Sequence, residues 1–238
     1  MSRIKIITSL LHLNEWLIFY PRLRRFYKRE IGTAQPVVLD VGSNKGQTID
    51  FFLGLFPSVR IYGFEPNNDL FKRLVSKYSD NTNISIANCG VSDQTGKLMF
   101  KETVTNETST FEELNYDSEY LKMKSKVLGV TPDKIVKKTY EVDVLTLNNF
   151  ITTNKIGQID VIKIDTEGHE YKCLQGLFGS TPVSATFIQL EHHNDDMYSN
   201  KATSEMISEL LAQNGYSLYA TVRHGFGDFD ELIYKKGK

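Results

Sequence analysis

Cysteine and net charge are both scarce in this chain. Cys89 and Cys173 are its only cysteines, and each lies in an apolar pattern. We therefore expect buried free thiols, a reducing compartment and a cytoplasmic location rather than a disulfide. The formal net charge is −1. A chain so close to neutral lacks the basic excess with which proteins neutralise phosphates, so nucleic acid is not the expected partner.

Long apolar runs are also missing. Near the N-terminus, Lys5, His12, Asn14 and Glu15 interrupt the apolar pattern, well short of the about 18 clean residues expected of a membrane span. No small-residue cleavage site follows, which argues against a secretory signal. The length of 238 residues suits one α/β domain. We assign a helical extension to residues 1–30 and a single domain to residues 31–238, with an insertion at 103–138.

The extension differs in charge from the rest of the chain, because it holds seven basic and two acidic residues. Its apolar residues recur at helical spacing. Two interpretations follow. We favour a helical flap packed on the domain and covering a ligand; the alternative is a peripheral helix whose basic flank meets anionic lipid.

The dinucleotide fingerprint Gly-x-Gly-x-x-Gly is absent, which argues against an NAD-dependent oxidoreductase. Instead, the buried-strand pattern of residues 37–41 contains Asp40 near its end. Gly42 and Gly46 follow in a turn, and a helical pattern comes directly after this turn. Strand, glycine turn and helix are typical of the ligand corner of a doubly wound sheet. With no phosphate cradle, an acid at this point favours S-adenosylmethionine (SAM), which carries an amino group, a sulfonium and a ribose diol.

A second acid supports this interpretation. The strand pattern at residues 60–64 ends in Glu65, and Pro66 stops it. An acid at the end of the second strand can accept hydrogen bonds from both ribose hydroxyls. Residues 84–91 read as a third strand, and Asp93 in the polar turn after it is a candidate acceptor for the adenine amino group.

The insertion at 103–138 breaks the alternation of strands and helices. Its aromatic residues, Phe111, Tyr116 and Tyr120, suit a lid or substrate wall that stacks on a flat or sugar-like face.

A second acidic corner follows the strand pattern at residues 159–165. Asp165, Glu167, His169 and Glu170 crowd its end, where open α/β sheets bind ligands. The next strand, at 186–191, brings Glu191, His192 and His193 to the same edge. Two closing strands at 216–223 and 230–234 predict a seven-stranded sheet whose last strand is antiparallel, with helices on both faces.

With these motifs in view, the chain resembles the FkbM-type family of SAM-dependent methyltransferases. The resemblance implies the class I methyltransferase (Rossmann-like) fold, SAM as donor, and O-methylation of a hydroxyl on a sugar, glycan or small metabolite. It also implies that Asp165 and Glu167 face the methionine end of SAM and the substrate. The segments that carry it are 38–46, 63–66, 91–96 and 162–170, and the residues implied to line SAM are Asp40, Gly42, Ser43, Asn44, Gly46, Glu65, Pro66 and Asp93.

A sugar hydroxyl is a weak nucleophile, so its methylation benefits from a general base. His192 is the first candidate and His169 the second. A divalent metal on Asp165 with Glu191 or His192 is a weaker alternative, because the spacing is no dedicated metal signature, and we assign no metal. N-methylation of a small molecule or nucleic acid, and a non-catalytic binding module on the same scaffold, remain as alternatives.

Overall fold

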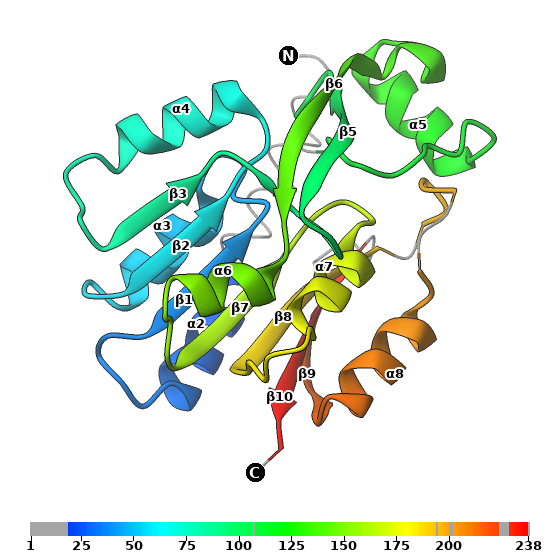
Figure 1. The fold of residues 1–238 in the computed structure, drawn as a ribbon. Helices are drawn as coiled ribbons and strands as arrows, with labels where there is room; N and C mark the ends of the chain where they lie inside the picture. The colour runs from blue at the N-terminus through cyan, green and yellow to red at the C-terminus, as the bar shows by residue number, and fades with distance from the viewer. Residues whose placement is uncertain (1–18, 107, 194, 200–201, 224–228, 238) are drawn as a thin grey trace.

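The computed structural model describes residues 19–106, 108–193, 195–199, 202–223 and 229–237 (Figure 1). Its centre is a seven-stranded sheet with the strand order β3-β2-β1-β7-β8-β10-β9. The strands are β1 (Val37–Val41), β2 (Arg60–Phe64), β3 (Ile84–Ala87), β7 (Ile159–Ile164), β8 (Ala185–His193), β9 (Tyr216–Arg223) and β10 (Phe229–Lys236).

The five strands from β3 to β8 pair in parallel, and β10 pairs antiparallel with both β8 and β9. The predicted seven-stranded sheet with an antiparallel last strand is therefore confirmed. Because β1, β2, β7 and β8 run in one direction, the residues that end them meet at one edge of the sheet. This edge carries the two acidic corners of the sequence.

Helices cover both faces of the sheet because its strands are apolar on both faces. Val38 packs in one core cluster with α2 (Tyr20–Glu30), α3 (Gln47–Leu55) and α4 (Asn68–Lys77). Its neighbour Leu39 packs in the other with α6 (Leu147–Thr153), α7 (Glu170–Leu177) and α8 (Ser204–Gln213). In Figure 1, α6 and α7 lie in front of the sheet and α2 and α3 behind it.

A second, three-stranded sheet has the order β4-β6-β5. It consists of β4 (Gly90–Val91), β5 (Gly96–Thr103) and β6 (Val136–Leu145), and the segment between β5 and β6 holds α5 (Glu119–Leu128) and the short helix η2 (Pro132–Lys134). This arrangement corrects the single strand expected at 84–91. The chain leaves the main sheet after Ala87 and pairs again at Gly90, but with β6.

Within the N-terminal extension the structure describes the helix α2 at Tyr20–Glu30. The helical pattern of the sequence, at Ile4, Ile7, Leu10 and Leu11, lies in residues 1–18, outside the described residues. Leu23, Phe26 and Tyr27 are buried against the sheet. Peripheral membrane contact by the extension stays a prediction. Among the helices that the structure describes, none combines the length and apolar character of a membrane span. Cys89 and Cys173 are buried free thiols, as expected.

The contact between α2 and the sheet combines apolar packing with one buried hydrogen bond. The hydroxyl of Tyr27 donates to Oε1 of Gln189 on β8, and both side chains are buried. We predict that Tyr27→Phe lowers the free energy of unfolding by about 1–3 kcal/mol, because Oε1 of Gln189 is left without a donor. Urea denaturation measures the change.

The matched control is Tyr219→Phe, which removes a hydroxyl that donates to Glu30 at an exposed position. We expect a change of less than about 0.5 kcal/mol there, as at most surface positions. Equal losses in the two variants would contradict the importance of the buried bond.

Candidate active site

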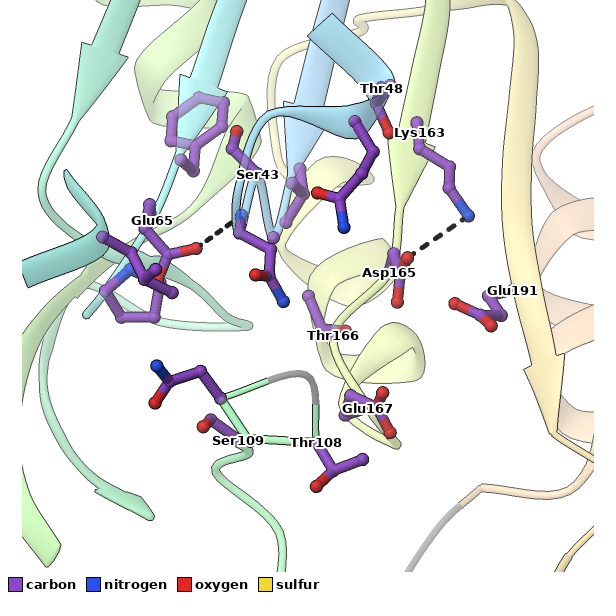
Figure 2. Close-up of a pocket in the computed structure, with 18 of the residues that line it drawn as sticks. Ser43, Thr48, Glu65, Thr108, Ser109, Lys163, Asp165, Thr166, Glu167 and Glu191 are labelled. Atoms are coloured by element: carbon purple, nitrogen blue, oxygen red, sulfur yellow. Dashed lines mark hydrogen bonds and ion pairs between the residues drawn. The ribbon is translucent and has the colours of Figure 1, made fainter. Parts of the chain in front are cut away.

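One cavity of about 560 Å³ opens at the carboxyl edge of the main sheet. This volume falls within the roughly 300–1,000 Å³ usual for small-molecule sites. The ends of β1, β2, β7 and β8 form its floor, while α2 and the insertion form walls. Figure 2 shows the side chains that line it. The predicted site residues among them are Gly42, Ser43, Asn44, Glu65, Pro66, Asp165 and Glu167.

The turn after β1 depends on two glycines with left-handed backbone. Gly42 has φ +85°, and a Cβ there would lie 1.9 Å from the backbone oxygen of Asp165. Only glycine allows the ends of β1 and β7 to approach so closely. Gly46 has φ +86°, and a Cβ there would lie 2.3 Å from the Tyr78 hydroxyl. Gly46 therefore serves the packing of the helix start and does not line the cavity.

Glu65 connects the turn to the end of β2. Its side chain is 4% exposed. One carboxylate oxygen accepts from the backbone N–H of Asn44 at 2.7 Å, and the other accepts from that of Asn67 at 2.8 Å. Burial raises the pKa of Glu65 to about 7, against the lowering effect of these two hydrogen bonds. Because each oxygen can accept more than one hydrogen bond, the carboxylate keeps capacity for ligand hydroxyls.

Asp40 lies elsewhere than the sequence predicted. It is 1% exposed and is not among the residues that line the cavity. Its side chain lies on the α3 face of β1, interacting with Ser43 and Thr48, and burial raises its pKa to about 6. Its Oδ2 is buried with no hydrogen-bond partner in the structure. The expectation that Asp40 and Glu65 share one crevice is thus corrected: Glu65 lines the cavity, whereas Asp40 lies behind the turn.

The acidic corner after β7 divides into two parts. Asp165 and Glu167 line the cavity, and Glu167 accepts a hydrogen bond from the hydroxyl of Tyr198 at 2.6 Å. Glu170 faces the other way and accepts from the backbone of Thr166 and Gly168 at 3.0 and 3.2 Å. Of the three acids at this corner, Asp165 and Glu167 therefore line the cavity, whereas Glu170 stabilises the turn.

The two histidines named as base candidates do not line the cavity. His169 is 1% exposed, and its ring nitrogens lie 2.6 Å from a carboxylate oxygen of Glu112 and 3.0 Å from the hydroxyl of Ser92. It joins the insertion to the main sheet. His192 is half-buried with Nε2 3.1 Å from the Ser204 hydroxyl. Neither histidine is positioned to take a proton from a ligand in this cavity.

Asp93 is also separate from the cavity. It lies beside a smaller, second pocket formed with α6 and α7, and its carboxylate accepts from the hydroxyl of Ser92 at 2.9 Å. The structure does not bring it to the main cavity, so its contact with adenine stays a prediction. Of the three aromatic residues expected in a lid, Phe111 and Tyr120 line the cavity, whereas Tyr116 is exposed.

A buried charged cluster at the floor was missed by the motif analysis. Lys163, the fifth of the six residues of β7, is 4% exposed and lies 2.7 and 2.9 Å from the carboxylate oxygens of Glu231 on β10. Its ammonium also lies 3.7 Å from Asp165. Glu231 accepts a further hydrogen bond from Gln189 at 2.9 Å. Lys163, Gln189, Glu191 and Glu231 all line the cavity.

A signal for this cluster is present in the sequence, since Lys163 lies in a buried strand whose other residues, apart from Asp160, are apolar, and a buried lysine needs an acidic partner. In the described part of the chain, no three His, Cys, Asp or Glu side chains gather in a way that could hold a metal ion.

The buried carboxyl of Asp40 makes a testable contribution to stability. Its pKa is raised from 3.8 to about 6 on folding, so folding binds a proton between these values and the penalty for its charge is fully present only above the folded pKa. We predict that Asp40→Asn stabilises the ligand-free protein at about pH 8 by up to about 3 kcal/mol and has little effect near pH 4. Denaturant unfolding at both values, beside wild type, measures this difference. An effect of equal size at the two pH values would contradict it.

Comparison with known proteins places the chain in a family. The sequence profile of the methyltransferase FkbM domain matches residues 40–218. The 2-O-methyltransferase NoeI of Sinorhizobium fredii is 24% identical over 180 residues, which are 74% of this chain and 71% of NoeI.

Two solved structures share the fold. The FkbM methyltransferase from Methylobacillus flagellatus KT superposes with a TM-score of 0.53 at 15% identity, over 87% of this chain and 45% of its own length. The magnesium protoporphyrin IX methyltransferase of Synechocystis PCC 6803, solved with bound SAM, gives a TM-score of 0.53 at 11% identity, over 100% of this chain and 85% of that one. The chain thus has the class I methyltransferase fold, and because the profile matches well over half of its residues, it belongs to the FkbM methyltransferase family.

Proposed function

We propose that this protein transfers the methyl group of SAM to a hydroxyl group of a sugar, glycan or other small metabolite. The single observation that carries the proposal is Glu65. Its carboxylate is buried at the end of β2, lines the cavity, and is fixed on the cavity side of the glycine turn by two backbone N–H groups. This is the acceptor that a ribose diol needs.

The residues present fit SAM in two further respects. The buried Oδ1 of Asn44, a residue that lines the cavity, has no partner within the protein, so one polar group at the turn is left for a ligand or water to satisfy. The turn after β1 has fewer glycines than a pyrophosphate-binding loop requires. Its Gly42 nevertheless lets a ligand approach the backbone. When bound, SAM would supply an electrophilic methyl group on a cationic sulfur.

The walls of the cavity support a hydroxylated acceptor. Thr108 and Ser109 present hydroxyl groups, while Tyr20, Phe111 and Tyr120 present aromatic rings. Aromatic faces beside hydrogen-bonding groups suit a ring that is apolar on its faces and polar at its edge, as a sugar is. The name of NoeI, a 2-O-methyltransferase, supports transfer to oxygen. We place the activity in the cytoplasm, because both cysteines are buried free thiols.

The role of Glu65 can be tested by substitution. We predict that Glu65→Gln weakens the binding of SAM and of S-adenosylhomocysteine (SAH) by at least about tenfold, since an amide offers one acceptor oxygen where the carboxylate offers two and loses charge-assisted hydrogen bonds. Isothermal titration calorimetry measures both affinities, and the melting temperature verifies that the variant folds.

Glu205→Gln, at an exposed position in the first turn of α8, is the matched control and should bind SAH as wild type does. A Glu65→Gln protein that folds and binds SAH with unchanged affinity would refute the proposed cofactor site. A screen of radiolabelled methyl transfer from SAM to methyl glycosides and hydroxylated metabolites tests the acceptor class.

A further inference from the structure

Glu191 holds a position that no motif assigns to a function. It is the seventh residue of β8, where this strand reaches the carboxyl edge of the sheet, and its half-buried side chain lines the cavity. Figure 2 shows its carboxylate reaching from β8 toward that of Asp165 at the end of β7. The two carboxyl groups therefore share one region of the cavity floor.

The charges around this pair decide its protonation. Asp165 and Lys163 face Glu191 from β7, and Glu231 faces it from β10, directly opposite in the strand pairing. Tyr27 of α2 lies close enough to Glu231 and Lys163 to be affected by both. Three carboxylates thus share one ammonium. Burial first, and then the charge of Asp165, raise the pKa of Glu191 well above its usual value, although Lys163 acts in the opposite direction.

Lys163 itself is not a candidate for proton transfer. The surrounding carboxylates of Glu231, Asp165 and Glu191 outweigh the effect of burial and raise the pKa of Lys163 far above its usual value. A lysine that stays charged at neutral pH cannot accept a proton. It instead stabilises the negative form of the carboxyl groups beside it, which keeps one of them available as a base.

We propose that the Glu191 carboxylate is the general base that takes the proton from the acceptor hydroxyl, with Asp165 and Lys163 as positioning residues. This inference rests on the proposed methyl transfer and names the group that activates its substrate. Glu191 is preferred to the histidines because it lines the cavity, whereas the ring nitrogens of His169 are taken up by Glu112 and Ser92. It is preferred to Glu167, which accepts a hydrogen bond from Tyr198 at 2.6 Å.

The step balances without any further reactant. A lone pair of the hydroxyl oxygen forms the bond to the methyl carbon as the carbon–sulfur bond breaks, and that bonding pair stays on sulfur as a thioether. The hydroxyl proton passes to Glu191, which later releases it to solvent. Because the pKa of Glu191 is raised above that of an ordinary carboxyl group, its carboxylate binds the hydroxyl proton more strongly, which favours the transfer.

Glu191→Gln tests the proposal, because glutamine keeps the size of the side chain and cannot accept the proton. With SAM and the best acceptor among methyl glycosides of the common hexoses, we predict that kcat falls roughly 100- to 10,000-fold. The acidic limb of the wild-type pH profile should disappear, and SAH affinity should be unchanged by calorimetry. Glu191→Asp, which restores a carboxylate with shorter reach, should recover part of kcat together with an acidic limb.

A readout without acceptor keeps the test decisive if no glycoside is methylated. Because the folded pKa of Glu191 is raised, the cost of ionising it grows as the pH rises above the ordinary carboxyl range, so ligand-free Glu191→Gln should be more stable relative to wild type at about pH 8 than near pH 4. Glu209→Gln, at an exposed position on α8, is the matched control and should match wild type in kcat, SAH affinity and stability at both values.

Three results would overturn the role of Glu191. These are a near wild-type kcat for Glu191→Gln at every pH, a loss of SAH affinity that accounts for its whole defect, or an equal stability difference at the two pH values. The second result would make Glu191 a ligand of the cofactor. Failure of wild type to bind SAH would instead overturn the proposed function, and the base with it.

Discussion

The burial of carboxyl groups at one edge of the sheet is the constraint on which the site depends. Asp40, Glu65, Asp165 and Glu191 lie at the ends of four neighbouring parallel strands, and the raised pKa values of Asp40 and Glu65 show how poorly the folded chain solvates them. Charge burial of this kind costs stability unless a partner offsets it. Within the described residues, Lys163 at the floor is the buried lysine that offsets part of this charge.

The backbone makes this concentration of charge possible. Gly42 lets the ends of β1 and β7 approach to a distance that any side chain would prevent, and the amides of Gly42 and Ser43 each donate to the carbonyl of Phe64 at 3.0 Å. The three strand ends are thereby joined into one rigid floor. The proposed donor SAM carries one positive charge and two vicinal hydroxyls, and would therefore offset part of this negative charge.

The sequence predicted those features that depend on local pattern. Strand ends, the glycine turn, Glu65 and the corner at Asp165 follow from short-range spacing, and the structure brings them to one cavity. The sequence could not predict the contacts of His169, because its partners Glu112 and Ser92 lie 57 and 77 residues away along the chain. Nor could it place Asp93, because the chain leaves the main sheet after Ala87 and β4 joins the small sheet.

The walls of the site were the least predictable part for the same reason. Aromatic residues of α2 and of the insertion meet across the cavity although about 90 residues separate Tyr20 from Phe111 in the sequence. The residues of the cavity walls, where we propose that the acceptor binds, are therefore set by long-range packing, whereas those of the proposed cofactor site are set by strand ends. Such a division lets one fold keep its donor while it varies its substrate.

The most direct test of the central claim is an NMR titration of the ¹⁵N-labelled protein with SAH. The account predicts that the largest amide shifts fall on Gly42, Ser43 and Asn44 and on Glu65 and Asn67, because the Glu65 carboxylate joins these two segments. No shifts at saturating SAH, or shifts confined to residues outside this edge of the sheet, would contradict it.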